Sequence, residues 1–255
     1  MKHIKIIIAA LCTILLSQPL LSQTSQIDDL WAKAEQQYKA QQYEDATESY
    51  RQLLNYGISA PLYYNYANAL LKSGHIGESI LNYERALRLA PNNDNIRFNL
   101  DFANNLKTDQ IDPIQPFFMS QWITSLEKVL TTNEWAYTAI ISFIVTLILV
   151  MVYLFGKITW LRKTAFFTAL AALIISVCSL SYSLSSKQHA LERNEAIVMA
   201  GSVSVKSSPD ESGTEVFVLH EGTKVTIRTS ITGWHEIRIA DGNIGWLETT
   251  AIEVI

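Results

Sequence analysis

Three long stretches without a charged residue constrain this chain more than any other feature. They run from Ile6 to Ile27, from Trp135 to Gly156 and from Thr164 to Ser186. About 20 apolar residues in a helix cross the hydrocarbon core of a bilayer, and the last two stretches are long enough. Helices at the surface of a soluble core normally keep a polar face, and these two show none. We therefore predict a two-helix transmembrane hairpin with spans at 135–156 and 164–186.

The first charge-free stretch has the organisation of a secretory signal. Lys2 and Lys5 precede an apolar core from Ile6 to Leu16, which is too short to span a bilayer unaided. Polar residues resume at Ser17, which favours cleavage over the alternative of an uncleaved anchor. The expected signal peptide covers residues 1–22.

The connection between the two spans predicts their orientation. Lys157, Arg162 and Lys163 place three positive charges and no negative one in the short segment 157–163. Short basic loops stay in the cytoplasm. The chain on both sides of the hairpin is then expected outside the cytoplasm. In a bacterium with two membranes, this means an inner-membrane protein with periplasmic N- and C-terminal domains.

Charge and cysteine content narrow the function classes. Residues 23–118 carry eight basic and twelve acidic side chains, and residues 187–255 carry six and ten, so both parts are acidic. Without a basic stripe, no nucleic acid is expected as a partner. The two cysteines are Cys12, in the expected signal, and Cys178, in the second span, so no disulfide framework is predicted.

No catalytic site emerges from the sequence. The five histidines are scattered, no pair has the spacing of metal ligands on a helix, and no glycine-rich phosphate loop is present. We expect no enzyme activity, no metal and no cofactor.

A repeat dominates the region before the membrane. Tyr64-Asn65-Tyr66 recurs 34 residues later as Phe98-Asn99-Leu100. A helix–turn–helix period of 34 residues is the signature of the tetratricopeptide repeat, an all-α array. The best copy spans 60–93, with small residues where the paired helices touch, aromatic residues between them, Gly74 at the turn and Pro91 at the end.

Two further segments complete the expected array over residues 27–106. A looser copy spans 27–59 and lacks the closing proline. After Pro91 a helix over 94–106 has no partner helix behind it, so we expect it to cap the last repeat.

The first helices of such repeats line a concave groove. The side chains left for that groove, once packing positions are removed, are candidates for binding a protein segment: Tyr64, Asn65, Asn68, Lys72, Phe98 and Asn99. An asparagine amide can bond a peptide backbone as donor and as acceptor. The alternative is that these positions, Asn65 and Asn99 above all, serve packing. Trp31 and Glu35 occupy the first-repeat groove, so an acidic tail is not an expected ligand.

The segment 107–134 joins the repeats to the membrane. Its prolines at Asp112-Pro113 and Gln115-Pro116 predict a stiff linker. The following apolar residues fall on one helical face: Phe118, Trp122, Leu126, Val129 and Leu130. That face predicts a short helix in the membrane interface that contacts lipid. Packing of the same face on the repeats is an equal alternative.

After the second span the pattern changes to short β-branched segments separated by turns. The spacing over 190–255 predicts a small all-β barrel of five or six strands. The order of "VSVKSSP", "LHEGTKV" and "GWHEIRIADGNIGWL" resembles the bacterial SH3-like domain. Such domains often bind cell-wall peptide or a protein segment, and the resemblance makes Trp234, His235 and Trp246 the candidate surface. Packing of the two tryptophans within the barrel is the alternative.

The complete order of segments is signal, repeats with a cap, two membrane helices and an SH3-like barrel. This order, with "NYERALRLAPNNDNIRFNLDFA" as its most specific stretch, resembles the BatE family of aerotolerance-operon proteins. The resemblance implies a membrane complex with proteins that carry von Willebrand-type domains or repeats, and a part in tolerance of oxygen or envelope stress. A scaffold within such a complex is the first hypothesis. A sensor that binds peptidoglycan peptide through the barrel is the second.

Overall fold

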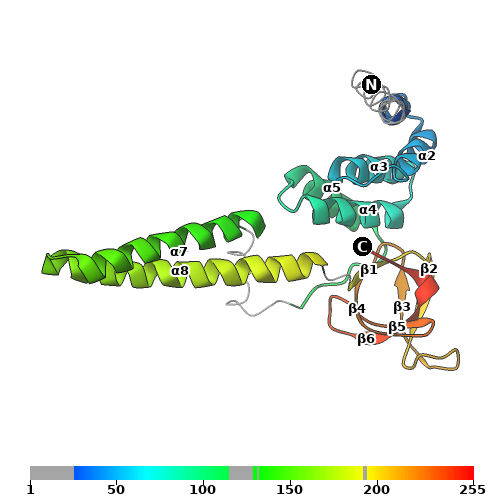
Figure 1. The fold of residues 1–255 in the computed structure, drawn as a ribbon. Helices are drawn as coiled ribbons and strands as arrows, with labels where there is room; N and C mark the ends of the chain where they lie inside the picture. Colours follow the sequence, from blue (N-terminus) through cyan, green and yellow to red (C-terminus); the bar gives the residue numbers. More distant parts are fainter. Residues whose placement is uncertain (1–25, 115–128, 131, 192–193) are drawn as a thin grey trace, which may run out of the picture. The chain divides into compact units, whose positions relative to one another are not determined.

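The computed structural model describes residues 26–114, 129–130, 132–191 and 194–255 (Figure 1). These residues form two compact units, and the first joins the chain up to Asp112 with the chain from Asn194 onward. The second unit is the chain between them. The expected signal peptide and most of the expected interfacial helix lie outside the described residues.

Five helices form the described N-terminal part of the first unit, residues 26–112. They span residues 26–39, α2 Tyr43–Leu53, α3 Ala60–Lys72, α4 Ile76–Leu89 and α5 Asp94–Leu106. Two of them begin at residues whose side chains accept hydrogen bonds from the first helical turn. Ser59 Oγ accepts from Leu62 N, and Asn93 Oδ1 accepts from Ile96 N, so free backbone donors are satisfied at both helix starts.

The predicted second repeat and cap agree with helices α3, α4 and α5. Gly74 takes a φ of +89° between α3 and α4, a conformation that glycine adopts without strain. Ala67 and Ala86 are fully buried, and Ser79 Oγ donates to the carbonyl of Ala67 at 3.0 Å. These small side chains let the two helices of the repeat pack closely.

Seven antiparallel strands form the C-terminal part of the first unit. They are β1 Glu195–Val198, β2 Ser202–Lys206, β3 Glu215–His220, β4 Lys224–Ile231, β5 Trp234–Arg238, β6 Ile244–Glu248 and β7 Ile252–Val254, with the 3₁₀ turn η1 Thr249–Ala251 before the last. Their order in the sheet is β3-β2-β6-β5-β4-β1-β7. One sheet face encloses an apolar core that includes Val205, Leu219, Val225, Ile237 and Leu247.

The sheet corrects the expected strand number. A closed barrel of five or six strands was the prediction, whereas the sheet has seven strands and its end strands, β3 and β7, are not paired with each other. The chain turns at η1 and adds β7 beside β1, which leaves β3 as the opposite edge. The all-β class of this region is confirmed, but closure is not found.

The second unit is a helical hairpin of α7 Thr132–Phe155 and α8 Thr159–Leu191. Both helices are long and apolar enough to cross a membrane. Ser176 Oγ donates to the carbonyl of Ala139 across the pair at 2.9 Å, and the Trp135 and Tyr182 rings lie 5.1 Å apart. The connection is shorter than predicted. Because α8 already begins at Thr159, only residues 156–158 of the chain between the spans are non-helical.

Candidate functional site: the repeat groove and its junction with the sheet

A hydrogen-bonded cluster links α3, α4 and α5 on the side where the groove was expected. The Tyr83 hydroxyl donates to Asn68 Oδ1 at 2.6 Å, and Asn99 Nδ2 donates to the same oxygen at 2.8 Å. Asn99 Nδ2 also donates to the Tyr64 hydroxyl at 3.0 Å. We call these four residues, Tyr64, Asn68, Tyr83 and Asn99, the groove network. The Tyr83 ring is fully buried, and this burial raises the pKa of its hydroxyl.

The groove network leaves a defined set of polar atoms unused. Asn68 Oδ1 already accepts two hydrogen bonds, and Asn99 Nδ2 already donates two. The Asn68 amide N–H groups and the Asn99 carbonyl oxygen have no partner among the described residues. The Tyr64 hydroxyl accepts from Asn99 and keeps its own proton free to donate.

The structure brings together three of the six predicted groove residues, namely Tyr64, Asn68 and Asn99. Asn65 is half-buried on α3 and takes no part in the network, and Lys72 is exposed at the end of that helix. Phe98 is 71% exposed on α5. Tyr83, which the sequence assigned to packing alone, is the member that sequence reasoning missed.

An apolar stripe continues from Phe98 along α5. Phe102 and Leu106 are 52% and 48% exposed, although both are large apolar side chains. Spacing of four residues places the three on one side of the helix. The opposite side of α5 is buried through Ile96, Leu100 and Ala103. The sequence already contained a sign of this stripe. The apolar residues between Asp94 and Leu106 spread over more of the helix surface than a single buried face would need.

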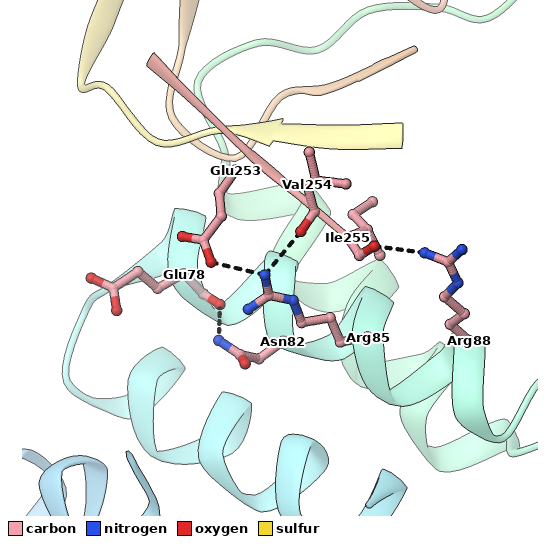
Figure 2. A network of polar contacts seen from close by, with 7 residues as sticks. All are labelled: Glu78, Asn82, Arg85, Arg88, Glu253, Val254 and Ile255. Atoms are coloured by element: carbon pink, nitrogen blue, oxygen red, sulfur yellow. Dashed lines mark hydrogen bonds and ion pairs between the residues drawn. The ribbon is translucent and has the colours of Figure 1, made fainter. Parts of the chain in front are cut away.

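The sheet is attached to helix α4 by two arginines. Arg85 Nη2 donates to Glu253 Oε1 at 2.8 Å and to the carbonyl of Val254 at 2.9 Å. One turn further along, Arg88 Nη1 donates to the backbone oxygen of Ile255 at 2.6 Å. Figure 2 shows both arginines reaching from α4 to the chain that follows η1.

A second ionic contact lies nearby. Lys224 at the start of β4 contacts Glu84 Oε2 at 3.1 Å and Glu195 Oε2 at 2.9 Å. Burial by itself would lower the pKa of Lys224, but the two carboxylates outweigh it and raise the pKa above its ordinary value. The ammonium group therefore stays charged between a repeat helix and two strands.

The linker after α5 provides the third contact. Asp109 accepts hydrogen bonds from the His220 backbone N–H and from the Thr223 hydroxyl, each at 2.7 Å, and its other oxygen lies 2.7 Å from His220 Nδ1. Burial acts to raise the pKa of Asp109, but these hydrogen bonds outweigh it and hold the pKa below the ordinary value. Two residues further on, Ile111 packs against the sheet core.

Apolar packing joins these contacts into one interface. Ile197 and Ile255 belong to the same buried cluster as Ile80, Tyr83 and Leu100 of the repeats. We call the contacts of α4 and linker 107–112 with the sheet the junction. Its ionic and hydrogen-bonded contacts involve none of Tyr64, Asn68 or Asn99, so the sheet attaches to the repeats without using these side chains.

The predicted aromatic surface of the sheet divides between its two faces. Trp246 lies opposite Glu236 and Lys206, and Glu236 is two residues from Trp234, so both tryptophans lie on one face. Lys206 Nζ lies 5.4 Å from the centre of the Trp234 ring. His235 lies on the face of Ile237 and Leu247, which are core residues, and its Nδ1 is 2.8 Å from Ser230 Oγ.

Among the described residues, no group of three or more histidine, cysteine, aspartate and glutamate side chains is placed to hold a metal ion. The groove network and the apolar stripe of α5 offer hydrogen-bonding groups, ring surface and apolar contact area.

Comparison with known proteins supports the repeat. Residues 60–93 match the family model of the tetratricopeptide repeat. These are the residues of the best copy predicted from the sequence, and they form α3, α4 and the turn before α5. No curated protein matches the chain.

Proposed function

We propose that this chain is a membrane-anchored, non-catalytic scaffold whose repeat groove binds a segment of a partner protein. The main support for this proposal is the groove network, which lies largely within the matched tetratricopeptide repeat. The network leaves polar atoms without partners, and α5 carries an exposed apolar stripe beside them. Repeat arrays present concave surfaces to partners, and exposed apolar patches mark interaction sites.

The sheet domain acts in this proposal as a brace for the repeats. Two helix pairs and a cap are close to the smallest stable array, because each repeat is stabilised by its neighbours. The junction adds Ile197 and Ile255 to the core of the last repeat. Its contacts on α4 support this role for the domain, whose strand pattern resembles the bacterial SH3-like family.

Two features support the membrane orientation that we propose. Residues before and after the hairpin belong to one compact unit, as expected if both lie on the same side of the membrane. Lys157, Arg162 and Lys163 near the hairpin tip favour the cytoplasm for the tip. We propose an inner-membrane location with the first unit in the periplasm. With a membrane-impermeant thiol reagent on spheroplasts, Ser230→Cys should be labelled and Thr159→Cys should not. The reverse pattern would overturn the orientation.

The proposed partners are proteins of a Bat-type membrane complex, with von Willebrand-type or repeat domains, in tolerance of oxygen or envelope stress. The test is co-purification of the tagged chain from native membranes in mild detergent. A variant with Asn65→Ala, Asn68→Ala and Asn99→Ala should lose a defined set of proteins while remaining folded. Ile58→Ala, at an exposed apolar residue outside the groove network, is the control. An unchanged set with the triple variant would contradict groove binding.

A cell-wall sensor is the second candidate, supported by the shared face of Trp234 and Trp246. Rigid aromatic side chains provide large contact area at small entropy cost. Deleting the sheet domain would also remove the brace, so a point substitution is the sharper test. Trp246→Ala should abolish sedimentation of the full chain with purified peptidoglycan if the sensor hypothesis holds. Wild-type chain that fails to sediment would exclude it.

A further inference from the structure

We infer that the tip of the α7–α8 hairpin, residues 155–163, is a binding surface for anionic phospholipid headgroups. This inference rests on the membrane location proposed above. It goes beyond the groove function, because it assigns a ligand to the second unit of the chain. It starts from positive charges that the hairpin itself does not compensate.

The tip carries three cations and no anion. Lys157, Arg162 and Lys163 are all exposed, and the described residues give them no ion-pair partner. No acidic residue occurs between Trp135 and Leu191. Glu134, in the first turn of α7, is about 30 Å from the tip along the helix axis. Three like charges in so short a segment repel one another, so the tip requires anions from outside the hairpin.

Arg162 is held against the end of α7. Its Nε donates to the Tyr153 carbonyl at 3.0 Å, which satisfies one of the free carbonyls in the last turn of that helix. Its guanidinium carbon lies 5.4 Å from the centre of the Tyr153 ring. The two terminal nitrogens of Arg162 have no partner among the described residues. They form a planar fork that matches the oxygens of a phosphate group.

Large apolar side chains share the tip with these cations. Phe155, Ile158 and Trp160 are 80%, 63% and 72% exposed. In water they would form an apolar patch at the end of the hairpin, and such patches mark interaction sites. Tryptophan is enriched at the level of lipid headgroups, where lysine side chains also extend their ammonium groups toward the phosphates. An anionic lipid surface therefore satisfies both kinds of side chain, whereas a soluble phosphate satisfies only the charges.

The length of α7 places the tip at the same level. Its 24 residues span about 36 Å, which exceeds the hydrocarbon core of about 30 Å but not the about 40 Å that includes the headgroups. A hairpin centred in the bilayer thus ends within the headgroup layer. Arg162 and Lys163 come three and four residues after Thr159, the start of α8, so they lie about 5 Å deeper. Their side chains reach phosphate groups from that depth.

The test uses the full chain in nanodiscs with equal parts of phosphatidylglycerol and phosphatidylcholine that have identical acyl chains. A nanodisc presents both leaflets, so the result does not depend on the proposed orientation. Native mass spectrometry of the released chain gives the ratio of the two lipids that remain bound. A parallel wild-type sample contains glycerol 3-phosphate, which carries the phosphate without the acyl chains.

Two double variants are compared with the wild type. Lys157→Gln with Lys163→Gln, the tip variant, removes two charges and leaves Arg162 on Tyr153. Lys33→Gln with Lys39→Gln is the control, because it removes the same charge from exposed residues of the helix over 26–39.

The expected result for the wild type is a preference for phosphatidylglycerol of about fivefold or more, since each cation near an anionic surface contributes about this factor. The tip variant should lose most of this preference, and the control should keep it. Glycerol 3-phosphate should leave the wild-type ratio unchanged.

Three results would overturn the inference while the groove function stands. Equal retention of the two lipids by the wild type, or a preference that the tip variant keeps, would leave an acidic protein segment as the counterion of the tip. Loss of the preference in glycerol 3-phosphate would assign the tip to soluble phosphate compounds. A chain that fails to enter nanodiscs would overturn the inference and the proposed membrane location together.

Discussion

Gly77 on α4 and Gly222 in the turn between β3 and β4 lie against each other at the centre of the junction. A Cβ atom on Gly222 would come within 3.7 Å of the Gly77 Cα and 2.9 Å of Ile80 Cδ1. A Cβ atom on Gly77 would lie 3.2 Å from the Gly222 backbone nitrogen. The repeat and the sheet thus approach at a point with no room for side chains.

Gly222→Ala should therefore weaken the junction. Gly222 has a φ of +82°, and Gly233 in the next turn has the same φ with open space around its Cα. Both alanine variants carry the same backbone strain, of about 1 kcal/mol, but only Gly222→Ala also collides with Ile80. Thermal unfolding should show a larger loss of stability for Gly222→Ala than for Gly233→Ala. Equal losses would mean that the close approach adds nothing to stability.

Arg85→Met should release the end of the chain from α4. The substitution removes hydrogen bonds to Glu253 and Val254 while keeping an apolar stem, and we expect a loss of about 1–2 kcal/mol. Amide hydrogen exchange in β7 should speed up. Arg97→Met is the matched control, because Arg97 pairs on the surface with Asp94 three residues away. Exposed pairs contribute about 0–1 kcal/mol. Exchange in β7 that Arg85→Met leaves at the wild-type rate would contradict the role of Arg85.

Asp109→Asn should make the first unit less stable at neutral pH, by about 1.5–3 kcal/mol, because charge-assisted hydrogen bonds are lost. The folded-state pKa of Asp109 lies below its ordinary 3.8, so the ionised carboxylate stabilises the fold above that value. This stabilisation disappears as pH falls through the lowered pKa. The difference in melting temperature between wild type and variant should therefore be constant near neutrality and shrink below about pH 4. A difference that keeps its neutral-pH size at pH values well below the lowered pKa of Asp109 would exclude this role.

Ser176→Ala tests the packing of the α7–α8 hairpin. The Ser176 hydroxyl bonds the Ala139 carbonyl on the other helix, whereas the Ser181 hydroxyl bonds the Val177 carbonyl on its own helix. Interhelical hydrogen bonds in membranes contribute about 0.6 kcal/mol on average. Denaturation in detergent should show a loss of this order for Ser176→Ala and a smaller one for Ser181→Ala. A larger loss for Ser181→Ala would contradict the observed pairing.

Local patterns made much of the fold predictable. The spacing of small and aromatic residues, with Gly74 and Pro91, was enough to place α3, α4 and α5, because these helices are set by contacts within one repeat. The absence of charge gave the two long apolar helices in the same way. The strand pattern predicted an all-β region. It did not predict that β7 pairs with β1, because the pairing of strands far apart in the sequence is not encoded in either strand's own residues.

The junction could not be predicted for a related reason. Arg85 and Glu253 are 168 residues apart, and each is an ordinary surface residue within its own segment. Asp109 lies in the segment that was predicted to be a stiff linker. Nothing in the sequence indicated its three contacts with the chain around the β3–β4 turn. The residues of the groove network could be predicted in part, because the repeat period pointed to Asn99. The roles of Asn68 as acceptor and of Tyr83 as donor depend on how α3 and α4 face each other.

The discontinuous first unit has a consequence for the order of synthesis. The repeats leave the ribosome before the hairpin, but the strands that cover α4 follow it, from Glu195 onward. Until the hairpin and the strands after it have been made, Ile80 lacks the Ile197 and Ile255 contacts that complete its cluster. The repeats therefore reach their final packing only after the hairpin and the strands that follow it have been made. At the membrane location proposed above, this step comes after the hairpin has inserted.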